Sequence, residues 1–269
     1  MAYRITNISV DSRFADQYYD GTGEFMIRTP SIMRNVCRVA ITSVEIPQVA
    51  YVFSKRSDNT SFFFDISGVR HTGSIAYGNY TPVELAAAVA AAFDISGIRV
   101  SWNSITNRFT IKNTGTVPIV LTLASDFSSR ARYWGLGYWM GFRTQTLFVG
   151  SGSGSGSSVV ATAAPVTDPP AYALVQLQCP DMIESTLHRI ESGSYVQALA
   201  KVVLRNGVYQ IQYDDAGNDL LKENVYPSPT AISQLRFRLV DAYGATVEMG
   251  DTDWSLTLEV KEVVSSIAQ

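Results

Sequence analysis

The chain has 269 residues, of which 46% are hydrophobic and 17% charged, and its formal net charge is −3. This length allows a substantial core, and low charge with average hydrophobicity excludes an intrinsically disordered chain. A nearly neutral balance provides no basic field to attract nucleic acid or an anionic membrane. The chain has 14 Tyr, 12 Phe and 4 Trp but only 2 His. Many aromatic contact surfaces and few acid–base side chains favour a structural protein and disfavour an enzyme.

The N-terminal residues lack a basic segment followed by an apolar one, and no apolar run approaches the roughly 18 residues of a membrane span. We therefore expect a soluble, unsecreted protein without a membrane span. Cys37 and Cys179 are too few and too distant in sequence for a disulfide framework or a metal knuckle. We expect both to be buried free thiols.

The segment from Met33 to Glu45 is predicted to be a strand that ends at Pro47, because proline removes a donor from the ladder. Its two alternating faces are both apolar or small, which is typical of a strand lying between two layers. A short aromatic strand is predicted at 61–67, where polar residues and glycine mark both ends.

A single helix is predicted over 82–94. Thr81 is a suitable N-cap, Pro82 occupies the first helical position, and Glu84 stands where a capping box requires it. One narrow apolar stripe, which we expect to be buried, recurs at four-residue spacing in Leu85, Val89 and Phe93.

A hairpin is predicted over 98–113, where two alternating segments flank a short loop, and another strand at 117–123. The segment 130–142 contains many aromatic residues and three glycines, so we expect a short helical turn and a packed loop there.

Residues 150–158 alternate Gly and Ser and precede a stretch rich in Ala and Pro. Such a tract behaves as a coil and fits either a domain linker or a long exposed loop. Because the segments on both sides have similar composition, we favour the loop. We therefore expect an N-terminal arm over 1–32 and a single domain over 33–269, with a flexible insertion at about 143–170.

Strands with period-two alternation resume after Pro170, at 171–179, 198–204, 207–213, 233–241 and 254–264. Arg236 and Arg238 alternate with three apolar residues, which predicts a strand with one solvated face. Roughly nine or ten short strands with one helix predict an antiparallel β fold. Because the sequence has no blade repeat, we favour a β-sandwich and not a propeller.

The two histidines, His71 and His188, have no Cys, Asp or Glu at metal-ligand spacing on the same strand face, so we expect surface histidines. The sequence contains no nucleophile elbow, P-loop, zinc-protease motif or dinucleotide fingerprint. We therefore name no catalytic, cofactor-binding or metal residue and expect neither an enzyme nor a cofactor. A metalloenzyme that binds its metal through the two His and a carboxylate is the catalytic alternative.

Acidic residues gather near the last strand, where Asp251 and Asp253 follow Glu248. Their order does not fit a calcium-binding loop, and Asp is common in turns because it caps backbone donors. We therefore interpret them as turn residues. The same interpretation applies to Asp214, Asp215, Gly217 and Asn218.

Basic residues lie in two groups, the second among aromatic residues: Arg28, Arg34, Arg38, Lys55 and Arg56, then Arg130, Arg132 and Arg143. Arginine beside aromatic residues fits stacking on single-stranded nucleic acid or anchoring of a protein interface. Because the chain lacks an overall positive charge, we favour the protein interface and expect no direct nucleic-acid contact.

Five stretches covering about a third of the chain carry a family resemblance: VAITSVEIPQVAYVFS (39–54), YGNYTPVELAAAVAAAF (77–93), RVSWNSITNRFTIKN (99–113), LGYWMGF (136–142) and ISQLRFRLVDAYGATVEMGDTDWSLTLEVKEVV (232–264). In this order they resemble the single jelly-roll penton and minor capsid proteins of large double-stranded DNA viruses of eukaryotes. The Gly/Ser tract departs from the family's pattern.

The resemblance implies an eight-stranded antiparallel jelly-roll sandwich of two four-stranded sheets, with one short helix and the Gly/Ser-rich loop as an insertion. It also implies a structural protein of an icosahedral virion, assembled in the host cell, either as a vertex pentamer (penton) or as a minor capsid protein that cements the shell. The implied partners are further copies and the major capsid protein. The alternative function is that of a binding module: a carbohydrate-binding β-sandwich that stacks sugars on its tryptophans, which are Trp102, Trp134, Trp139 and Trp254.

Overall fold

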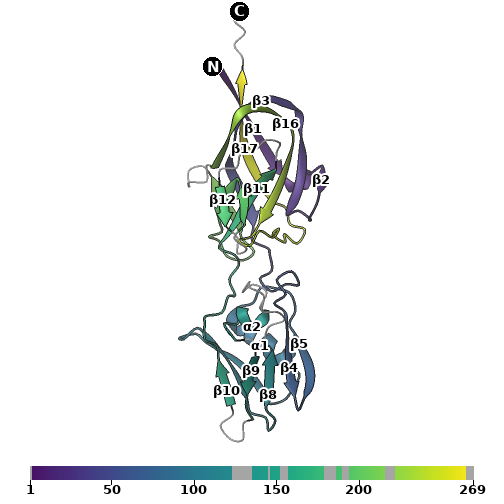
Figure 1. Ribbon diagram of the computed structural model, residues 1–269, viewed down its shortest axis with the longest axis vertical. Helices are drawn as coiled ribbons and strands as arrows, with labels where there is room; N and C mark the ends of the chain where they lie inside the picture. Colours follow the sequence, from purple (N-terminus) through teal and green to yellow (C-terminus); the bar gives the residue numbers. More distant parts are fainter. Residues whose placement is uncertain are drawn as a thin grey trace, which may run out of the picture. The chain divides into compact units, whose positions relative to one another are not determined.

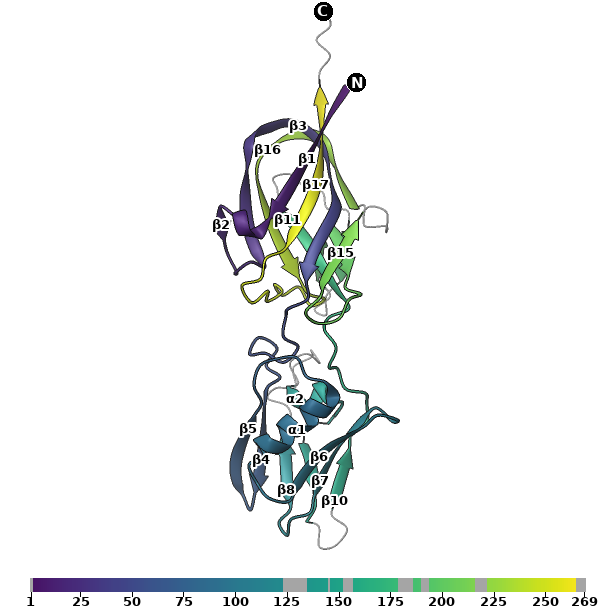
Figure 2. The same cartoon turned by 180° about the vertical axis from the view of Figure 1, so that it is seen from behind.

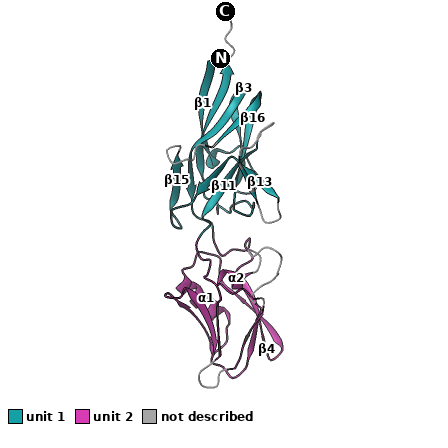
Figure 3. Ribbon diagram, turned by 60° about the vertical axis from the view of Figure 1, so that its left-hand side comes forward, with its two compact units in different colours: residues 1–50, 169–269 teal, residues 51–168 magenta. Residues whose placement is uncertain are grey.

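A computed structural model describes residues 2–122, 135–144, 146–151, 157–178, 186–189, 194–215 and 222–264. Contacts divide the chain into two compact units (Figure 3). Unit 1 combines residues 1–50 with 169–269, and unit 2 comprises 51–168. Each unit has its own hydrophobic core, because no member of either main cluster of buried residues comes from the other unit.

Unit 1 is built on one eight-stranded antiparallel sheet. Its strands are β1 (Ala2–Asp11), β2 (Gln17–Tyr18), β3 (Glu24–Pro47), β11 (Tyr172–Gln178), β14 (Ala200–Val203), β15 (Ile211–Asp215), β16 (Lys222–Val240) and β17 (Ser255–Val264). The main order is β1-β17-β3-β16-β11-β14, and β2 and β15 also pair with β3. A 3-10 turn, η1 (Ser12–Phe14), follows β1, and the hairpin of β12 (Thr186–Arg189) and β13 (Tyr195–Ala198) precedes β14.

Two long strands fold this sheet into two layers. β3 and β16 pair along most of their lengths and arch together over one end of unit 1 (Figures 1 and 2). On β3, the pairing with β17 is confined to the second half of the strand. On β16, the pairing with β11 is likewise confined to the second half. One layer is therefore β1-β17-β3-β15, and the other joins the first half of β3 to β16, β11 and β14. These are the two layers of a jelly roll, so the antiparallel all-β fold predicted from the sequence is confirmed.

The core of unit 1 lies between the layers and follows the alternation of the strands. Leu235, Phe237 and Leu239 are fully buried, whereas Arg236 and Arg238 point outward, as predicted. β3 ends at Pro47, also as predicted. Its two faces, however, are not both covered by layers. Register shifts against β16 and β17 interrupt the alternation, so residues such as Val39, Ala40 and Ile41 are all buried while Glu45 is exposed.

Unit 2 contains two smaller antiparallel sheets and two helices. One sheet has the order β5 (Val69–Ser74), β4 (Ser61–Ile66), β8 (Ile119–Thr122) and β9 (Thr146–Val149). The other has β10 (Ser157–Val160), β7 (Arg108–Asn113) and β6 (Ile98–Asn103). The predicted strand at 61–67 and hairpin over 98–113 therefore exist.

The helix α1 (Pro82–Ala92) forms where it was predicted. Thr81 and Glu84 make the full capping box, since the Thr81 hydroxyl accepts from the Glu84 amide and the Glu84 carboxylate accepts from the Thr81 amide. Its buried stripe is the predicted set of Leu85, Val89 and Phe93. The predicted helical turn in the aromatic segment is α2 (Leu136–Trp139), while residues 130–134 of that segment lie outside the described residues.

The expected domain boundaries differ from the observed units. Residues 2–11 of the expected N-terminal arm are strand β1 of the main sheet. The chain also leaves the jelly roll at residue 51 instead of about 143, because the α1 helix and the 98–113 hairpin bury their apolar faces in the second core. Of the Gly/Ser tract, residues 152–156 lie outside the described residues.

Candidate functional site

A groove lies on the outer face of the β1-β17-β3-β15 layer, close to the ends of its strands. The register places Asp11 opposite Ser255, Ser255 opposite Glu45, and Glu45 opposite Tyr213. Four neighbouring strands thus each contribute one residue to a row. The groove beside this row has a volume of about 330 Å³. Its lining includes the charged residues Asp11, Arg13, Glu45 and Asp253 and the apolar residues Pro47 and Ile211.

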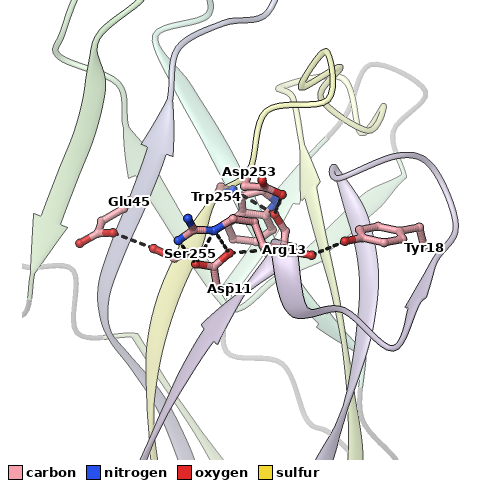
Figure 4. Close-up of polar contacts among 8 residues, drawn as sticks. Asp11, Arg13, Tyr18, Glu45, Asp253, Trp254 and Ser255 are labelled. Atoms are coloured by element: carbon pink, nitrogen blue, oxygen red, sulfur yellow. Dashed lines mark hydrogen bonds and ion pairs between the residues drawn. The ribbon is translucent and has the colours of Figure 1, made fainter.

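Ser12 fixes one wall of the groove (Figure 4). Its hydroxyl donates to Asp253 Oδ1 at 2.7 Å and accepts from the Trp254 amide at 3.1 Å. The Ser12 amide donates to the Trp254 carbonyl, and Tyr18 donates its hydroxyl proton to the Ser12 carbonyl. Ser12 is fully buried, and its bond from the Trp254 amide is buried with it, whereas the bonds to Asp253 and from Tyr18 are partly buried. They hold the turn after β1 against the residues that precede β17.

Asp11 and Arg13 form an ion pair at the edge of the groove. The guanidinium of Arg13 donates to both carboxylate oxygens of Asp11, from Nε at 3.0 Å and 3.1 Å and from Nη2 at 2.5 Å. The Arg13 side chain holds the pKa of Asp11 below its usual value. The same bonds, with the nearby charge of Asp253, raise the pKa of Arg13.

The other side of the groove carries negative charge next to an aromatic ring. Ser255 donates its hydroxyl to Glu45 Oε2 at 2.7 Å, which orients this exposed carboxylate (Figure 4). Desolvation, with the charges of Asp215 and Glu45, raises the pKa of Tyr213. The described residues that line the groove include no histidine or cysteine, so they form no serine–histidine or cysteine–histidine pair. The groove is equipped for polar and apolar contact.

The histidines and the acidic residues do not come together as a metal site within the described parts of the chain. His71 lies on β5, where its ring stacks on Phe64 with centroids 5.2 Å apart. His188 lies on β12, but its side chain lies outside the described residues, as does Cys179. Cys37 is half-buried, not fully buried as expected, and its thiol donates to the Lys261 carbonyl.

The acidic residues before the last strand belong to a turn, as predicted. Thr252 donates its amide to the Met249 carbonyl, and Gly250 and Asp251 between them have φ values of 53° and 61°. Asp253 differs, because it accepts from Ser12, which is distant in sequence, instead of capping its own turn. Asp214 is not in a turn but buried in β15. Asp215 ends that strand, and Gly217 and Asn218 lie outside the described residues.

The described tryptophans are not all available for the sugar platform of the carbohydrate-binding alternative. Trp254 is buried in unit 1, where its indole donates to the Thr22 carbonyl and its ring contacts Phe25 edge to face. Trp102 and Trp139 belong to unit 2 and pack partly buried against its core. Trp134 lies outside the described residues. At least one of the four rings is therefore inaccessible to a sugar.

Several predicted interface arginines are committed to contacts within the chain. Arg38 forms ion pairs with Glu223 at 2.5 Å and Glu259 at 3.2 Å. Arg143 donates to the Tyr138 carbonyl and lies 4.1 Å above that ring. The amides of Arg28 and Arg34 bond to Asp16 and Glu262, and Lys55 and Arg56 are exposed in unit 2. Arg130 and Arg132 lie outside the described residues.

Sequence reasoning did not identify Ser12, Arg13 or Glu45 as site residues. The contacts of Ser12 and Glu45 join segments more than 200 residues apart, and no local spacing signals such pairs. Arg13 instead pairs with Asp11, two residues before it. The dipeptide Asp11-Ser12 is the single local signal, since Asp commonly accepts from a backbone amide two residues on, as Asp11 does from Arg13.

Comparison with solved structures finds a protein of similar fold. The mavirus penton protein matches over 98% of this chain and 100% of its own, with a TM-score of 0.50 and 9% sequence identity. The two chains share a fold. Because a match over 98% of the chain cannot omit unit 2, the similarity extends over both units. No protein-family model and no curated protein sequence matches the chain. No helix among the described residues is long and apolar enough to cross a membrane.

Proposed function

We propose that this chain is a structural protein of a viral capsid and that it forms the vertex pentamer, the penton, of an icosahedral shell. The observation that carries the proposal is the fold shared with a penton protein along nearly the whole of both chains, including the unit inserted into the jelly roll. A fold alone does not assign a function, so the proposal needs a direct test.

The geometry of the described site supports a structural role over a catalytic one. The groove residues are engaged in hydrogen bonds that join strand ends, and they pair no nucleophile with a base. We propose that the chain is not an enzyme, needs no cofactor and is located in the virion. Its partners are further copies of itself and the major capsid protein.

The test is the mass of the purified protein, measured by light scattering over a range of concentrations, followed by its position in the particle. The proposal expects a closed ring of copies in solution and, by electron cryomicroscopy, density for the fold at the fivefold vertices. Density under the facets instead would assign the chain to the minor capsid proteins. A compact monomer at all concentrations and no density in the particle would overturn the capsid role.

A further inference from the structure

One face of the β10-β7-β6 sheet of unit 2 is turned to solvent. Ile98, Phe109 and Ile111 lie on the other face and are buried in the core of the unit. The residues that alternate with them point outward from the three strands, which are labelled in Figure 2. We call this outward surface the basic face. Its members are Arg99, Ser101, Asn103, Arg108, Thr110, Lys112, Ser158 and Val160.

The strand register places the cations of the basic face in two rows. Arg99 lies directly opposite Lys112, and Lys112 lies opposite Ser158 on the other side. Arg108 lies opposite Asn103, four residues from Lys112 along β7. At about 3.3 Å per residue the two rows are about 13 Å apart, and three neighbouring strands span about 10 Å. Three cations therefore share one small area of the sheet.

No carboxylate of the sheet neutralises these cations. The strands β6, β7 and β10 and the loop between β6 and β7 contain no Asp or Glu. Within the described part of the chain, Arg99, Arg108 and Lys112 form no ion pair, and Arg108 donates only to backbone carbonyls. Like charges directly opposite each other on a sheet are destabilising. Arg99 and Lys112 therefore repel each other, and an anion bound between them would remove this repulsion.

The charge of the chain is divided unequally between its units. Unit 2 contains 9 Lys and Arg against 6 Asp and Glu, whereas unit 1 contains 12 against 18. The formal net charge of −3 is therefore composed of +3 in unit 2 and −6 in unit 1. Because charges of one sign attract their opposite and repel their like, a polyanion is drawn to unit 2 and repelled by unit 1.

The donors of the basic face suit the oxygens of sulfate or phosphate groups. Guanidinium and ammonium groups bind such oxyanions, and Ser101, Thr110 and Ser158 add hydroxyl donors beside them. Groups of Lys and Arg bind either nucleic acid or heparin-like polysaccharides. None of the eight residues is aromatic, whereas single-stranded nucleic acid stacks on aromatic rings. Three cations are also fewer than the roughly 6–10 phosphate contacts of a protein that binds a duplex. These features favour a sulfated polysaccharide.

We propose that the basic face of unit 2 binds a linear sulfated polysaccharide, with one sulfate group between Arg99 and Lys112 and another at Arg108. The hydroxyl side chains between the two rows bind the hydroxyl groups of the sugar. The site belongs to unit 2 alone and does not depend on the proposed capsid role. In a capsid it would attach the particle to sulfated glycans, where several copies multiply a weak contact.

The test measures binding of the full-length protein to heparin, a highly sulfated linear polysaccharide, by isothermal titration calorimetry. Arg99→Gln combined with Lys112→Gln removes the two opposed charges. Lys55→Gln combined with Arg70→Gln is the matched control, because it removes two charges from unit 2 outside the basic face. The melting temperature of the basic-face variant should not fall, since a repulsion is removed. If the double variant does not fold, the two single variants replace it.

Wild type should bind heparin, and added salt should weaken the binding because counterions are released from the polymer. The basic-face variant should raise the apparent dissociation constant at least about tenfold, whereas the control should change it less than about threefold. The dependence of the dissociation constant on salt should also become shallower in the basic-face variant, which makes fewer ionic contacts. Light scattering checks that both variants assemble as wild type does, so that a difference in the number of linked sites does not produce the effect.

Further probes distinguish the possible ligands of the basic face. Heparin from which the sulfate groups have been removed should not bind. Duplex DNA that binds as tightly as heparin would assign the face to nucleic acid and overturn the polysaccharide. A wild type that does not bind heparin, or equal losses in the basic-face variant and the control, would overturn the site and leave the capsid role intact. A wild type that stays monomeric and is absent from the particle, but binds heparin through this face, would overturn the capsid role and support the site.

Discussion

The hydroxyl of Ser12 donates to the carboxylate of Asp253 across 2.7 Å and so joins two segments that are 241 residues apart in sequence. Through this bond the turn after the first strand of the jelly roll is fixed to the residues that precede its last strand. The same hydroxyl accepts from the Trp254 amide, so a single buried side chain satisfies two groups of the later segment.

Replacing this serine should destabilise unit 1. Ser12→Ala removes the partner of the buried Trp254 amide, and an unsatisfied buried polar group costs about 1–3 kcal/mol, while the half-buried Asp253 carboxylate only loses one bond. We expect a lower free energy of unfolding by that amount in a urea titration. Ser255→Ala, which removes an exposed bond to Glu45, is the control and should cost less. Equal decreases in the free energy of unfolding of the two variants would contradict the view that the bonds of Ser12 matter more because Ser12 is buried.

Gly73 is expected to tolerate no side chain. It lies in β5, where an added Cβ would overlap the Phe62 ring and approach the Ala92 carbonyl oxygen to 2.9 Å. Gly73→Ala should therefore lower the stability of unit 2 by about 1–3 kcal/mol, the usual range for overpacking. Gly207→Ala, with no atom closer than 4.0 Å to the new Cβ, is the control. Thermal unfolding of both variants would measure the difference, and an unchanged melting temperature for Gly73→Ala would refute it.

Unit 2 should fold without the rest of the chain. Its buried apolar residues contact one another in their own cluster, and the unit is one continuous segment, 51–168. A protein consisting of this segment should show a β-rich circular dichroism spectrum and a single cooperative thermal transition. The Gly73→Ala substitution should lower the melting temperature of this fragment as well. A spectrum of disordered chain with no transition would show that the second core is insufficient.

The capping box of α1 predicts a pH dependence. Bonds from the Thr81 amide and hydroxyl hold the pKa of Glu84 below its ordinary value of 4.5. A carboxyl group whose pKa is lowered by folding stabilises the folded state at any pH above its pKa in the unfolded chain. This contribution is lost as the pH falls through its pKa in the folded state. Wild type should therefore be more stable than Glu84→Gln at pH 7, and the two should converge in acid. Comparison of melting temperatures at both pH values checks this, and a difference that does not change with pH would contradict it.

Local sequence signals were sufficient for most of the individual elements. Thr81, Pro82 and Glu84 predicted where α1 begins, and the alternation around Arg236 and Arg238 predicted which face of β16 is buried. Both predictions depend on neighbours within a few residues, where helix capping and strand alternation operate. The faces of β3 were predicted less well, because the shifts in its register come from strands β16 and β17 far away in sequence.

The sequence by itself determined that this protein is an antiparallel all-β protein with one substantial helix, since propensity, capping and alternation are local properties. Only the tertiary structure decided that residues 51–168 form a separate core and that residues 2–11 belong to the main sheet. It also decided that Ser12 meets Asp253 and that Glu45 meets Ser255. The reason is physical: hydrophobic burial is not directional, so an apolar stripe specifies that it will be covered but not which distant segment covers it.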